Sequence, residues 1–235
     1  RMMADRPYVG RFAPSPTGRL HMGSLVAAVA SFLDARCHGG TWLVRIEDLD
    51  PPREVPGATS DILRTLEGHG LTWDGPVMHQ SNRDHVYAKV LEDMLKKDLA
   101  YGCICTRKQL AAADGLTTYP GTCRTGLPEG TPPRSIRFKM PAGEDIVWKD
   151  RFAGMQAISR SQIGDVILRR ADGYWAYHLA VVVDDMSQGV TDIVRGADLL
   201  DSSAVHLAIQ LALGATLPRY GHVPVLRNAD GQKLS

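Results

Sequence analysis

The segment Pro14–Ser24, PSPTGRLHMGS, constrains the fold of this chain more than any other feature. It holds two prolines and two glycines, and it joins a short β-type run, Tyr8–Ala13, to an apolar helical pattern, Ser24–Arg36. We expect Ser24 to cap that helix. The run Thr41–Ile46, with its Trp, Leu and Val, then predicts a buried strand. This order of strand, turn, helix and strand indicates an α/β fold with a parallel sheet and right-handed crossovers.

The rest of the chain continues this pattern and interrupts it once. Helices are expected over Ala58–His69 and over Asp84–Lys97, the second capped by Asp84. The interruption predicts three parts: residues 8–100 as the first half of a catalytic domain, 101–175 as an inserted subdomain, and 176–235 as the second half. The expected elements of the later parts are a short helix near Arg107–Ala113, strands over Ser135–Met140 and Asp165–Arg170, an apolar segment Tyr177–Asp185, a strand Asp192–Gly196, a helix Ser202–Leu213 and a segment Val223–Leu226.

Composition excludes several classes of protein. The net charge is +1, from 27 basic and 26 acidic residues, so the chain is not a strongly basic nucleic-acid binder, and any RNA contact must come from local patches. No apolar run approaches the roughly 20 residues needed to cross a bilayer, and the N-terminus lacks an apolar signal core. We therefore expect a cytoplasmic protein without a membrane partner, and we expect a monomer.

The residues around the Pro/Gly turn predict a nucleotide site. Free N–H groups and the dipole at a helix start attract phosphate. Gly23 has no side chain, so a base or ribose can approach the backbone there, and His21 can donate a hydrogen bond to phosphoryl oxygens. The alternative is an ordinary turn before an ordinary helix. A dinucleotide G-x-G-x-x-G motif and a Walker A loop are both absent from the sequence.

The motifs together identify a family resemblance that runs from about Tyr8 to Ser235. The segment RFAPSPTG, followed by LHMGS, resembles the first signature of class I glutamyl-tRNA synthetases. Further similarities lie in Arg45–Asp50 (RIEDLD), Val183–Asp185 (VDD), Val194–Gly196 (VRG) and Lys233–Ser235, which resembles the start of a K-L-S-K signature. The second lysine of that signature would lie beyond the chain end, so we expect a truncated chain. The resemblance implies a Rossmann-like parallel sheet with an inserted zinc-binding α+β subdomain.

Three features resemble a group of short paralogues, the glutamyl-queuosine tRNA(Asp) synthetases. Ser24 closes the H-x-G-S motif, where ordinary glutamyl enzymes commonly carry Gly or His. Residues 45–54 spell RIEDLDPPRE, and the cysteine block has the C-x-C…Y-x-x-x-C form of the paralogues. This resemblance implies that L-glutamate, ATP with Mg²⁺, and tRNA(Asp) bearing queuosine are the substrates and partners.

The resemblance also implies residue roles. Arg11 and Arg195 stand at carboxyl ends of strands, where open α/β sheets bind ligands, and an arginine fork can hold a carboxylate. Glu47, after the second strand, can pair with an ammonium group. Arg11 and Glu47 can instead form a structural ion pair, and Arg195 can be a solvated strand end. The implied sets are Arg11, Ser15, Glu47, Tyr177 and Arg195 for glutamate; Pro14, Gly18, His21, Gly23, Ser24 and Lys233 for ATP; and His21 and Lys233 for catalysis.

Several carboxylates and thiols leave alternatives open. Asp48, Asp50 and the pair at 184–185 can bind Mg²⁺ or serve only the structure. Cys103, Cys105 and Cys123 supply three thiolates, but no histidine lies between the last two to complete a zinc site. They are either three packed reduced thiols or metal ligands. The resemblance favours one structural Zn²⁺, with Tyr119 as the fourth ligand.

The implied reaction forms glutamyl-adenylate and then transfers the glutamyl group to a hydroxyl of queuosine in the anticodon loop. Two alternatives remain: the catalytic half of a glutamyl-tRNA synthetase that charges tRNA(Glu), and a catalytically silent RNA-binding relative. A basic cluster of the insert either contacts RNA phosphates or forms a solvated charged face. Its members are Arg124, Arg134, Arg137 and Lys139.

Overall fold

The computed structural model describes residues 6–111 and 118–234. Ala112 and Ala113 of the expected short helix lie outside them, as does Ser235 of the terminal signature. The strands are β1 (Val9–Phe12), β2 (Thr41–Ile46), β3 (Met78–His79), β4 (Ala100–Cys103), β5 (Ser135–Phe138), β6 (Ile146–Asp150), β7 (Gly154–Ile158), β8 (Ile167–Arg169), β9 (Asp192–Gly196) and β10 (Arg219–Val223). The α-helices are α1 (Met22–Cys37), α2 (Ala58–Gly68), α3 (Asp84–Lys96), α4 (Arg107–Ala111), α5 (Arg160–Ile163), α6 (Tyr177–Ser187) and α7 (Leu200–Ala212).

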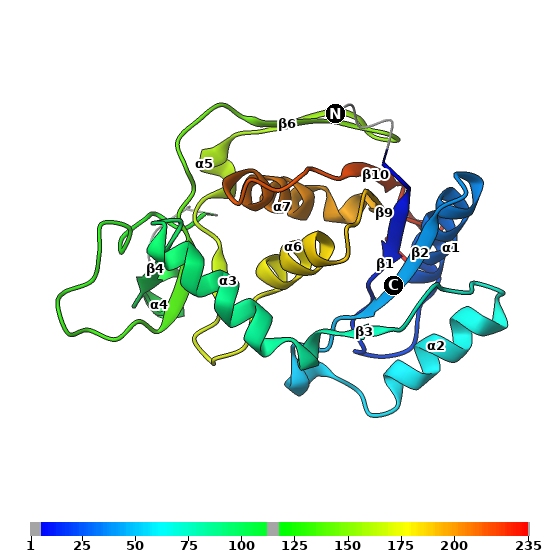
Figure 1. The fold of residues 1–235 in the computed structure, drawn as a ribbon, viewed down its shortest axis with the longest axis horizontal. Helices are drawn as coiled ribbons and strands as arrows, with labels where there is room; N and C mark the ends of the chain where they lie inside the picture. The colour runs from blue at the N-terminus through cyan, green and yellow to red at the C-terminus, as the bar shows by residue number, and fades with distance from the viewer. Residues whose placement is uncertain (1–5, 112–117, 235) are drawn as a thin grey trace.

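The predicted parallel pairing is confirmed. β1 pairs with β2, β2 with β3, and β9 with β10, all in parallel. The two groups meet at β1, where the Thr191 N–H, just before β9, donates to the Val9 carbonyl (2.9 Å). Figure 1 shows α1 and α2 on one side of the β1–β2 ribbon, with α6 and α7 on the other. The carboxyl ends of β1, β2 and β9 therefore reach one edge of the fold.

Two helix starts differ from the predicted caps. α1 begins at Met22, and its cap is His21, whose Nδ1 accepts from the Ser24 N–H (3.2 Å). Ser24 lies in the first turn, so its prediction as the cap was wrong. Asp84 is likewise the first residue of α3 rather than its cap, and its carboxylate accepts from the Trp175 indole N–H (3.0 Å).

For two later segments the sequence predicted the location but not the complete helix or strand. Tyr177–Asp185 belongs to helix α6, and seven consecutive residues of that helix, Leu179–Asp185, are buried. Of the expected segment Val223–Leu226, only Val223 lies in a strand. It is the last residue of β10, which begins at Arg219.

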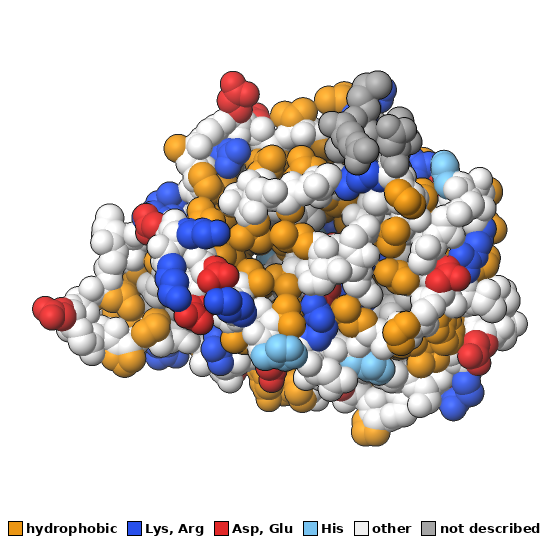
Figure 2. All heavy atoms as spheres, viewed as in Figure 1, with side chains coloured by type: hydrophobic (Ala, Val, Ile, Leu, Met, Phe, Trp, Pro, Cys, Tyr) orange, Lys and Arg blue, Asp and Glu red, His pale blue; other side chains and the backbone are white. Residues whose placement is uncertain are grey.

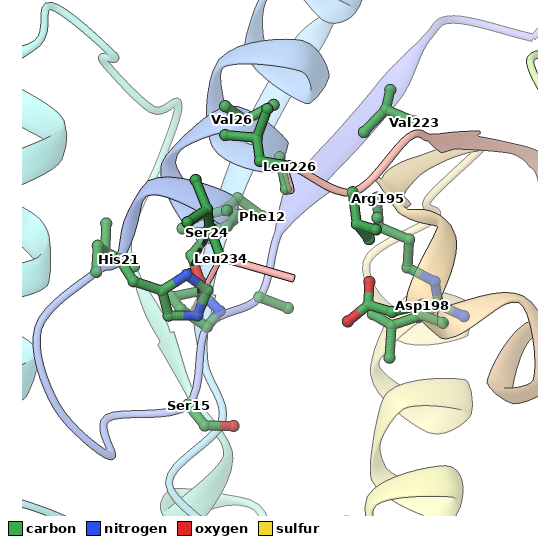
Figure 3. Close-up of a pocket in the computed structure, with 18 of the residues that line it drawn as sticks. Phe12, Ser15, His21, Ser24, Val26, Arg195, Asp198, Val223, Leu226 and Leu234 are labelled. Atoms are coloured by element: carbon green, nitrogen blue, oxygen red, sulfur yellow. Dashed lines mark hydrogen bonds between the residues drawn. The ribbon is translucent and has the colours of Figure 1, made fainter. Parts of the chain in front are cut away.

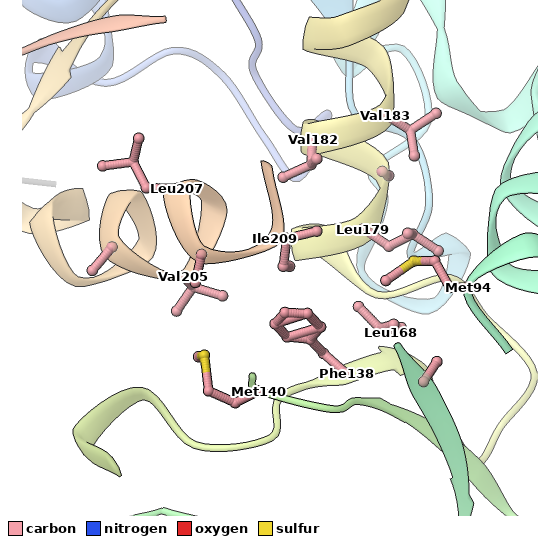
Figure 4. Packing of buried hydrophobic residues seen from close by; sticks show 14 of the residues in the cluster. Met94, Phe138, Met140, Leu168, Leu179, Val182, Val183, Val205, Leu207 and Ile209 are labelled. Carbon is pink, nitrogen blue, oxygen red and sulfur yellow. The ribbon is translucent and has the colours of Figure 1, made fainter. Parts of the chain in front are cut away.

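The described residues from 100 to 175 include an antiparallel sheet, β4-β5-β8, which contains the two predicted strands, and a β6-β7 hairpin that sequence patterns did not reveal. Several of their apolar side chains pack into the main core of the protein. Phe138, Met140 and Leu168 join the buried cluster that includes Leu179 of α6 and Ile209 of α7 (Figure 4). The part after β4 is thus packed onto the α/β part through one continuous core, and the division of the chain at residues 100 and 175 stays a prediction.

The predicted basic cluster of the insert is not a free patch. Arg124 pairs with Asp165 (2.7 Å) and Lys139 pairs with Asp98 (2.8 Å). Arg137 is buried, which neither alternative for the cluster anticipated. These three side chains contact an acidic group or, for Arg137, the half-buried ring of Tyr119, whereas Arg134 is exposed.

Elsewhere on the face drawn in Figure 2, basic and acidic side chains are mixed over α3. Lys96 of that helix, for example, pairs with Glu92 (2.8 Å). Such a mixture gives no large field of one sign. Within the described residues, no helix combines the length and the apolar character that a membrane crossing requires.

Candidate active site

The carboxyl edge of the parallel strands and the start of α1 enclose a cavity of about 450 Å³. Figure 3 shows His21 and Ser24 of the α1 start on one wall and Arg195 and Asp198 across from them. The structure brings every residue predicted for glutamate or ATP to this one cavity. They are Arg11, Pro14, Ser15, Gly18, His21, Gly23, Ser24, Glu47, Tyr177, Arg195 and Lys233.

A buried carboxylate lies behind Arg11, one of the residues that line the cavity. Asp185 of α6 accepts two hydrogen bonds from Arg11, at Nε and Nη2 (both 3.0 Å), and a third from Arg45 Nη2 (2.7 Å). All three side chains are nearly inaccessible to solvent. Burial alone would raise the pKa of Asp185. The two guanidinium groups have the larger opposite effect and lower the pKa to about 2. Arg11 is therefore paired with Asp185, and the suggested ion pair between Arg11 and Glu47 was wrong.

Glu47 carries a buried carboxyl group that forms no salt bridge among the described residues. Its backbone N–H donates to the Pro14 carbonyl (2.9 Å), which ties the end of β2 to the Pro/Gly turn. Its side chain accepts from the neutral Gln80 amide (3.0 Å). Burial raises the pKa of Glu47 to about 7, against the opposing effect of Arg45 and Arg11. The carboxylate is thus held in place without a cation of its own.

Arg195, in β9, is also buried, so the suggestion of a solvated strand end was wrong. Its Nη2 donates to Ser203 Oγ (2.8 Å) and to His206 Nδ1 (3.2 Å), and its Nη1 donates to the Tyr177 hydroxyl (3.3 Å). Each of these acceptors is neutral. Its Nε–H is buried and has no partner within the described part of the chain. Arg195 thus lines the cavity without a counter-ion among the described residues.

The opposite end of the cavity has the features of a phosphate site. Because His21 Nδ1 accepts from a backbone N–H, a neutral His21 carries its hydrogen on Nε2, which lies 3.0 Å from Ser24 Oγ and can donate to a phosphate in its place. A β-carbon on Gly23 would lie 3.3 Å from both the His21 ring and the Leu234 carbonyl, which explains the glycine there. Lys233 lines the same end, and its ammonium group pairs with Asp198.

The other acidic candidates are occupied by protein donors. Asp48 accepts from the Ser81 N–H (2.9 Å) and hydroxyl (2.6 Å). Asp184 accepts from Arg83 (2.6 Å), from Tyr87 (2.6 Å) and from Gln80. In the described ranges, carboxylates form no cluster with metal-ligand spacing. The pair at 184–185 is therefore buried and hydrogen-bonded to protein groups behind the cavities.

The three cysteines do form such a cluster. The Sγ atoms of Cys103, Cys105 and Cys123 lie within 4.8 Å of one another. The Tyr119 hydroxyl is 3.4 Å from Cys103 Sγ and 3.5 Å from Cys105 Sγ. Arg137 donates to Cys103 Sγ (3.4 Å), and its guanidinium carbon lies 3.7 Å from the Tyr119 ring centre. Burial raises the pKa of the Cys103 thiol, but the donors Tyr119 and Arg137 bring it down to about 7. Three thiols at this spacing, with the Cys103 thiol favoured as a thiolate, fit a metal ion.

A second cavity, of about 700 Å³, lies next to the first and shares Ser15, Glu47 and Tyr177 with it. Its far wall comes from the insert and includes Tyr119 and Arg137. A molecule bound there would meet the ligand of the first cavity at the shared residues.

Sequence reasoning missed three partners of the residues that line the first cavity. It did not assign Asp185 to Arg11, Gln80 to Glu47, or Asp198 to Lys233. The spacing of Asp198 after the VRG motif was a usable signal, since a residue two positions past a strand end faces the same edge. Gln80 carried no signal, because its partner is 33 positions away.

Comparisons with known proteins agree on one family. Residues 8–235 match the family described as tRNA synthetases class I (E and Q), catalytic domain. A protein named Glutamyl-Q tRNA(Asp) synthetase, from Chromobacterium violaceum, is 56% identical over 99% of this chain and 80% of its own length. A protein of the same name from Dechloromonas aromatica is 54% identical over 98% of this chain and 79% of its own length.

Solved structures show the same fold. A glutamate tRNA ligase from Elizabethkingia meningosepticum, solved with its amino acid, superposes with a TM-score of 0.88 at 33% identity over 98% of this chain. This chain spans about half of that protein, 52% of its length. The predicted class I catalytic fold is therefore confirmed.

The buried carboxylate of Asp185 generates a stability prediction. We expect Asp185→Asn to lower the free energy of unfolding at pH 7 by about 3–5 kcal/mol, because two buried guanidinium groups lose their counter-ion. Since the pKa of Asp185 is depressed, its stabilising effect is complete above its ordinary value of about 4 and is lost as the pH falls toward 2. Urea unfolding at pH 7 and at lower pH measures both effects. Asp201→Asn, at an exposed site on α7, is the control, and equal losses for the two variants would contradict the prediction.

Proposed function

Because the chain belongs to the catalytic-domain family of class I tRNA synthetases (E and Q), we propose that it activates L-glutamate with ATP and transfers the glutamyl group to queuosine in the anticodon loop of tRNA(Asp). The activation half rests on one observation: the cavity holds a buried cation, Arg195, and a buried acid, Glu47, that have no counter-ion among the described residues. The transfer half rests on relatives that carry the name Glutamyl-Q tRNA(Asp) synthetase.

Free glutamate matches this charge pattern. Arg195 can bind one carboxylate through its unpartnered Nε–H. Arg11 has given Nε and Nη2 to Asp185, so Nη1 is the atom it can offer to the other carboxylate. Glu47 pairs with the ammonium group, and the hydroxyls of Ser15 and Tyr177 complete the set. Two buried charges of opposite sign, set apart in one cavity, favour a ligand that is itself an amino acid.

The nucleotide occupies the end of the cavity at the start of α1. Pro14, Gly18, Gly23 and Ser24 bring backbone close to the adenosine and phosphates, and the helix start adds its dipole. An oxygen of the glutamate α-carboxylate attacks the α-phosphorus, and the bond from that phosphorus to the bridging oxygen breaks to release pyrophosphate. Positioning and charge stabilisation carry such a step.

Two side chains act on the developing charge. The Nε2–H of His21 stabilises the phosphoryl oxygens, and Lys233 neutralises the leaving pyrophosphate. Mg²⁺ bound with ATP supplies further positive charge. Lys233 must exchange Asp198 for phosphate, which its location at the rim of the cavity permits.

The acceptor approaches through the second cavity. It shares Ser15, Glu47 and Tyr177 with the glutamate site, so a hydroxyl placed there can reach the activated carbonyl carbon. That hydroxyl attacks, the acyl–phosphate bond breaks, and AMP leaves.

The predictions of a cytoplasmic location and of a monomeric state stay predictions.

ATP–pyrophosphate exchange with L-glutamate tests the proposal directly. We expect exchange without any tRNA, and transfer of labelled glutamate to tRNA(Asp) that contains queuosine but not to tRNA(Asp) that lacks it. L-Glutamine and L-aspartate are the matched control substrates and should give no exchange. Exchange that requires tRNA, with label on tRNA(Glu), would instead identify the catalytic half of a glutamyl-tRNA synthetase. No exchange under any condition would favour a silent RNA-binding relative.

The raised pKa of Glu47 generates a second prediction. Below pH 7 the buried carboxyl group takes up a proton and loses its attraction for the ammonium group. We expect the KM for glutamate to rise up to about tenfold per pH unit below about pH 7, while the KM for ATP stays nearly constant. Glu47→Gln should raise the KM for glutamate at every pH and remove its pH dependence. A constant KM for glutamate in the unaltered chain between pH 5.5 and 8 would contradict the role of Glu47.

For the cysteine cluster we propose one structural Zn²⁺ held by Cys103, Cys105, Cys123 and Tyr119. The Tyr119 hydroxyl lies within reach of two of the three sulfurs. Burial raises the pKa of this phenol, so a phenolate needs a cation, and both Zn²⁺ and the nearby Arg137 supply one. The metal would join segments of the insert that contribute only three buried residues to a cluster of their own.

Elemental analysis tests the metal. We expect about one zinc per chain. Tyr119→Phe should release zinc at a lower chelator concentration, because it removes one of four ligands, whereas Tyr174→Phe should leave the zinc content unchanged. A zinc-free preparation with an unaltered thermal unfolding midpoint would refute the site.

A further inference from the structure

The guanidinium group of Arg195 determines which atoms of its buried partners must accept hydrogen bonds. Its Nη2 carries two hydrogens, one directed to Ser203 Oγ (2.8 Å) and one to His206 Nδ1 (3.2 Å), both on α7. A guanidinium group donates and never accepts, so both of these atoms must be acceptors. The protonation states of the two buried partners follow from this one constraint.

The first chain of hydrogen bonds runs through two histidines. Because His206 Nδ1 accepts, its hydrogen lies on Nε2, which is 3.0 Å from His178 Nδ1. His178 Nδ1 must then accept in turn, and its own hydrogen lies on Nε2. Burial, followed by the charge of Arg195, lowers the pKa of His206 well below its ordinary value and that of His178 to about 4. Both rings are neutral at pH 7, and the chain ends at His178, which lines the second cavity.

The second chain runs from Arg195 to a carboxylate of the insert. Ser203 Oγ is 2.7 Å from His222 Nε2, and His222 Nδ1 is hydrogen-bonded to Asp150 at the end of β6. Burial lowers the pKa of His222, so its ring is neutral and donates to Asp150 through Nδ1. Ser203 therefore donates to His222, the nearer of its two acceptors (the Leu199 carbonyl is at 3.2 Å), while it accepts from Arg195.

This order of Ser203, His222 and Asp150 is that of a hydrolytic triad. It does not serve hydrolysis here, because Ser203 is 0% exposed and lines neither the first nor the second cavity. Its hydroxyl is already the acceptor for Arg195. The arrangement holds a side chain in place instead of attacking a substrate.

We propose that Ser203 and His206 are positioning residues that fix the guanidinium plane of Arg195 for glutamate, an inference that rests on the proposed function. They occupy both hydrogens of Nη2, and Tyr177 occupies one hydrogen of Nη1. The Nε–H and the second hydrogen of Nη1 are the donors left, and because they lie on opposite edges of the guanidinium group a carboxylate oxygen binds one of them. Because both partners on α7 are neutral, they orient the arginine without cancelling its charge.

Isosteric amides at residue 206 separate the two contacts of its ring. The Asn amide oxygen in His206→Asn can replace Nδ1 as the acceptor for Arg195, whereas the Gln amide in His206→Gln reaches the position of Nε2 and leaves Arg195 without that acceptor. In glutamate-dependent ATP–pyrophosphate exchange, we expect His206→Gln to raise the KM for glutamate roughly tenfold, the loss of one charged hydrogen bond. The KM for ATP should change less than about twofold, and His206→Asn should restore most of the affinity for glutamate.

Neighbouring serines supply a second, independent comparison. Ser203→Ala should raise the KM for glutamate in the same way, while Ser202→Ala, on the adjacent half-buried residue, should leave it unchanged. An unaltered chain without exchange would mean that the proposed function fails. An active unaltered chain with equal glutamate KM values for His206→Gln and His206→Asn would overturn the positioning role, as would equal effects on the KM for glutamate and for ATP.

Discussion

The buried carboxylate of Asp185 is the constraint on which the rest of the site depends. It joins three elements that lie far apart in sequence, because it accepts hydrogen bonds from Arg11 of β1 and Arg45 of β2 and itself belongs to α6. Removing three charges from water is costly, and only full hydrogen bonding offsets that cost. The strand ends and α6 are therefore held in one relative position. Glu47 and Arg195 face the same cavity as a consequence of that position.

Much of the cavity was predictable because of parallel-strand geometry. Residues that follow the carboxyl ends of parallel strands meet at one edge, so motifs at residues 11–24, 47 and 195 had to converge once the sheet was assigned. The cap of α1 was not predictable in the same way. Ser24 is the residue type that favours a cap, but the backbone leaves the helix at His21, whose ring takes over that role. Local propensity is a weak guide where a functional side chain occupies the helix start.

Pairs of side chains that lie far apart in the sequence could not be predicted from local patterns. Arg11 and Asp185 are 174 positions apart, and nothing in a local pattern distinguishes Asp185 from Glu47 as the partner of that arginine. The basic cluster of the insert failed for the same reason, since Asp165 lies 41 positions from Arg124. The alternating strand β6 was missed because its five residues, IVWKD, give too short a pattern to stand out. Its last residue, Asp150, nevertheless ends the chain of hydrogen bonds behind Arg195.

The two arginines of the cavity show how one residue type performs two tasks. Arg11 is bound by a carboxylate that compensates its charge and holds it rigidly, which leaves Nη1 as its donor toward the cavity. Arg195 is bound by a serine, a histidine and a tyrosine, which fix its direction and leave its charge uncompensated. A buried charge without a counter-ion is unfavourable in the empty site. In the proposed function that cost falls when glutamate binds, because its carboxylate and ammonium groups supply the counter-charges that Arg195 and Glu47 lack.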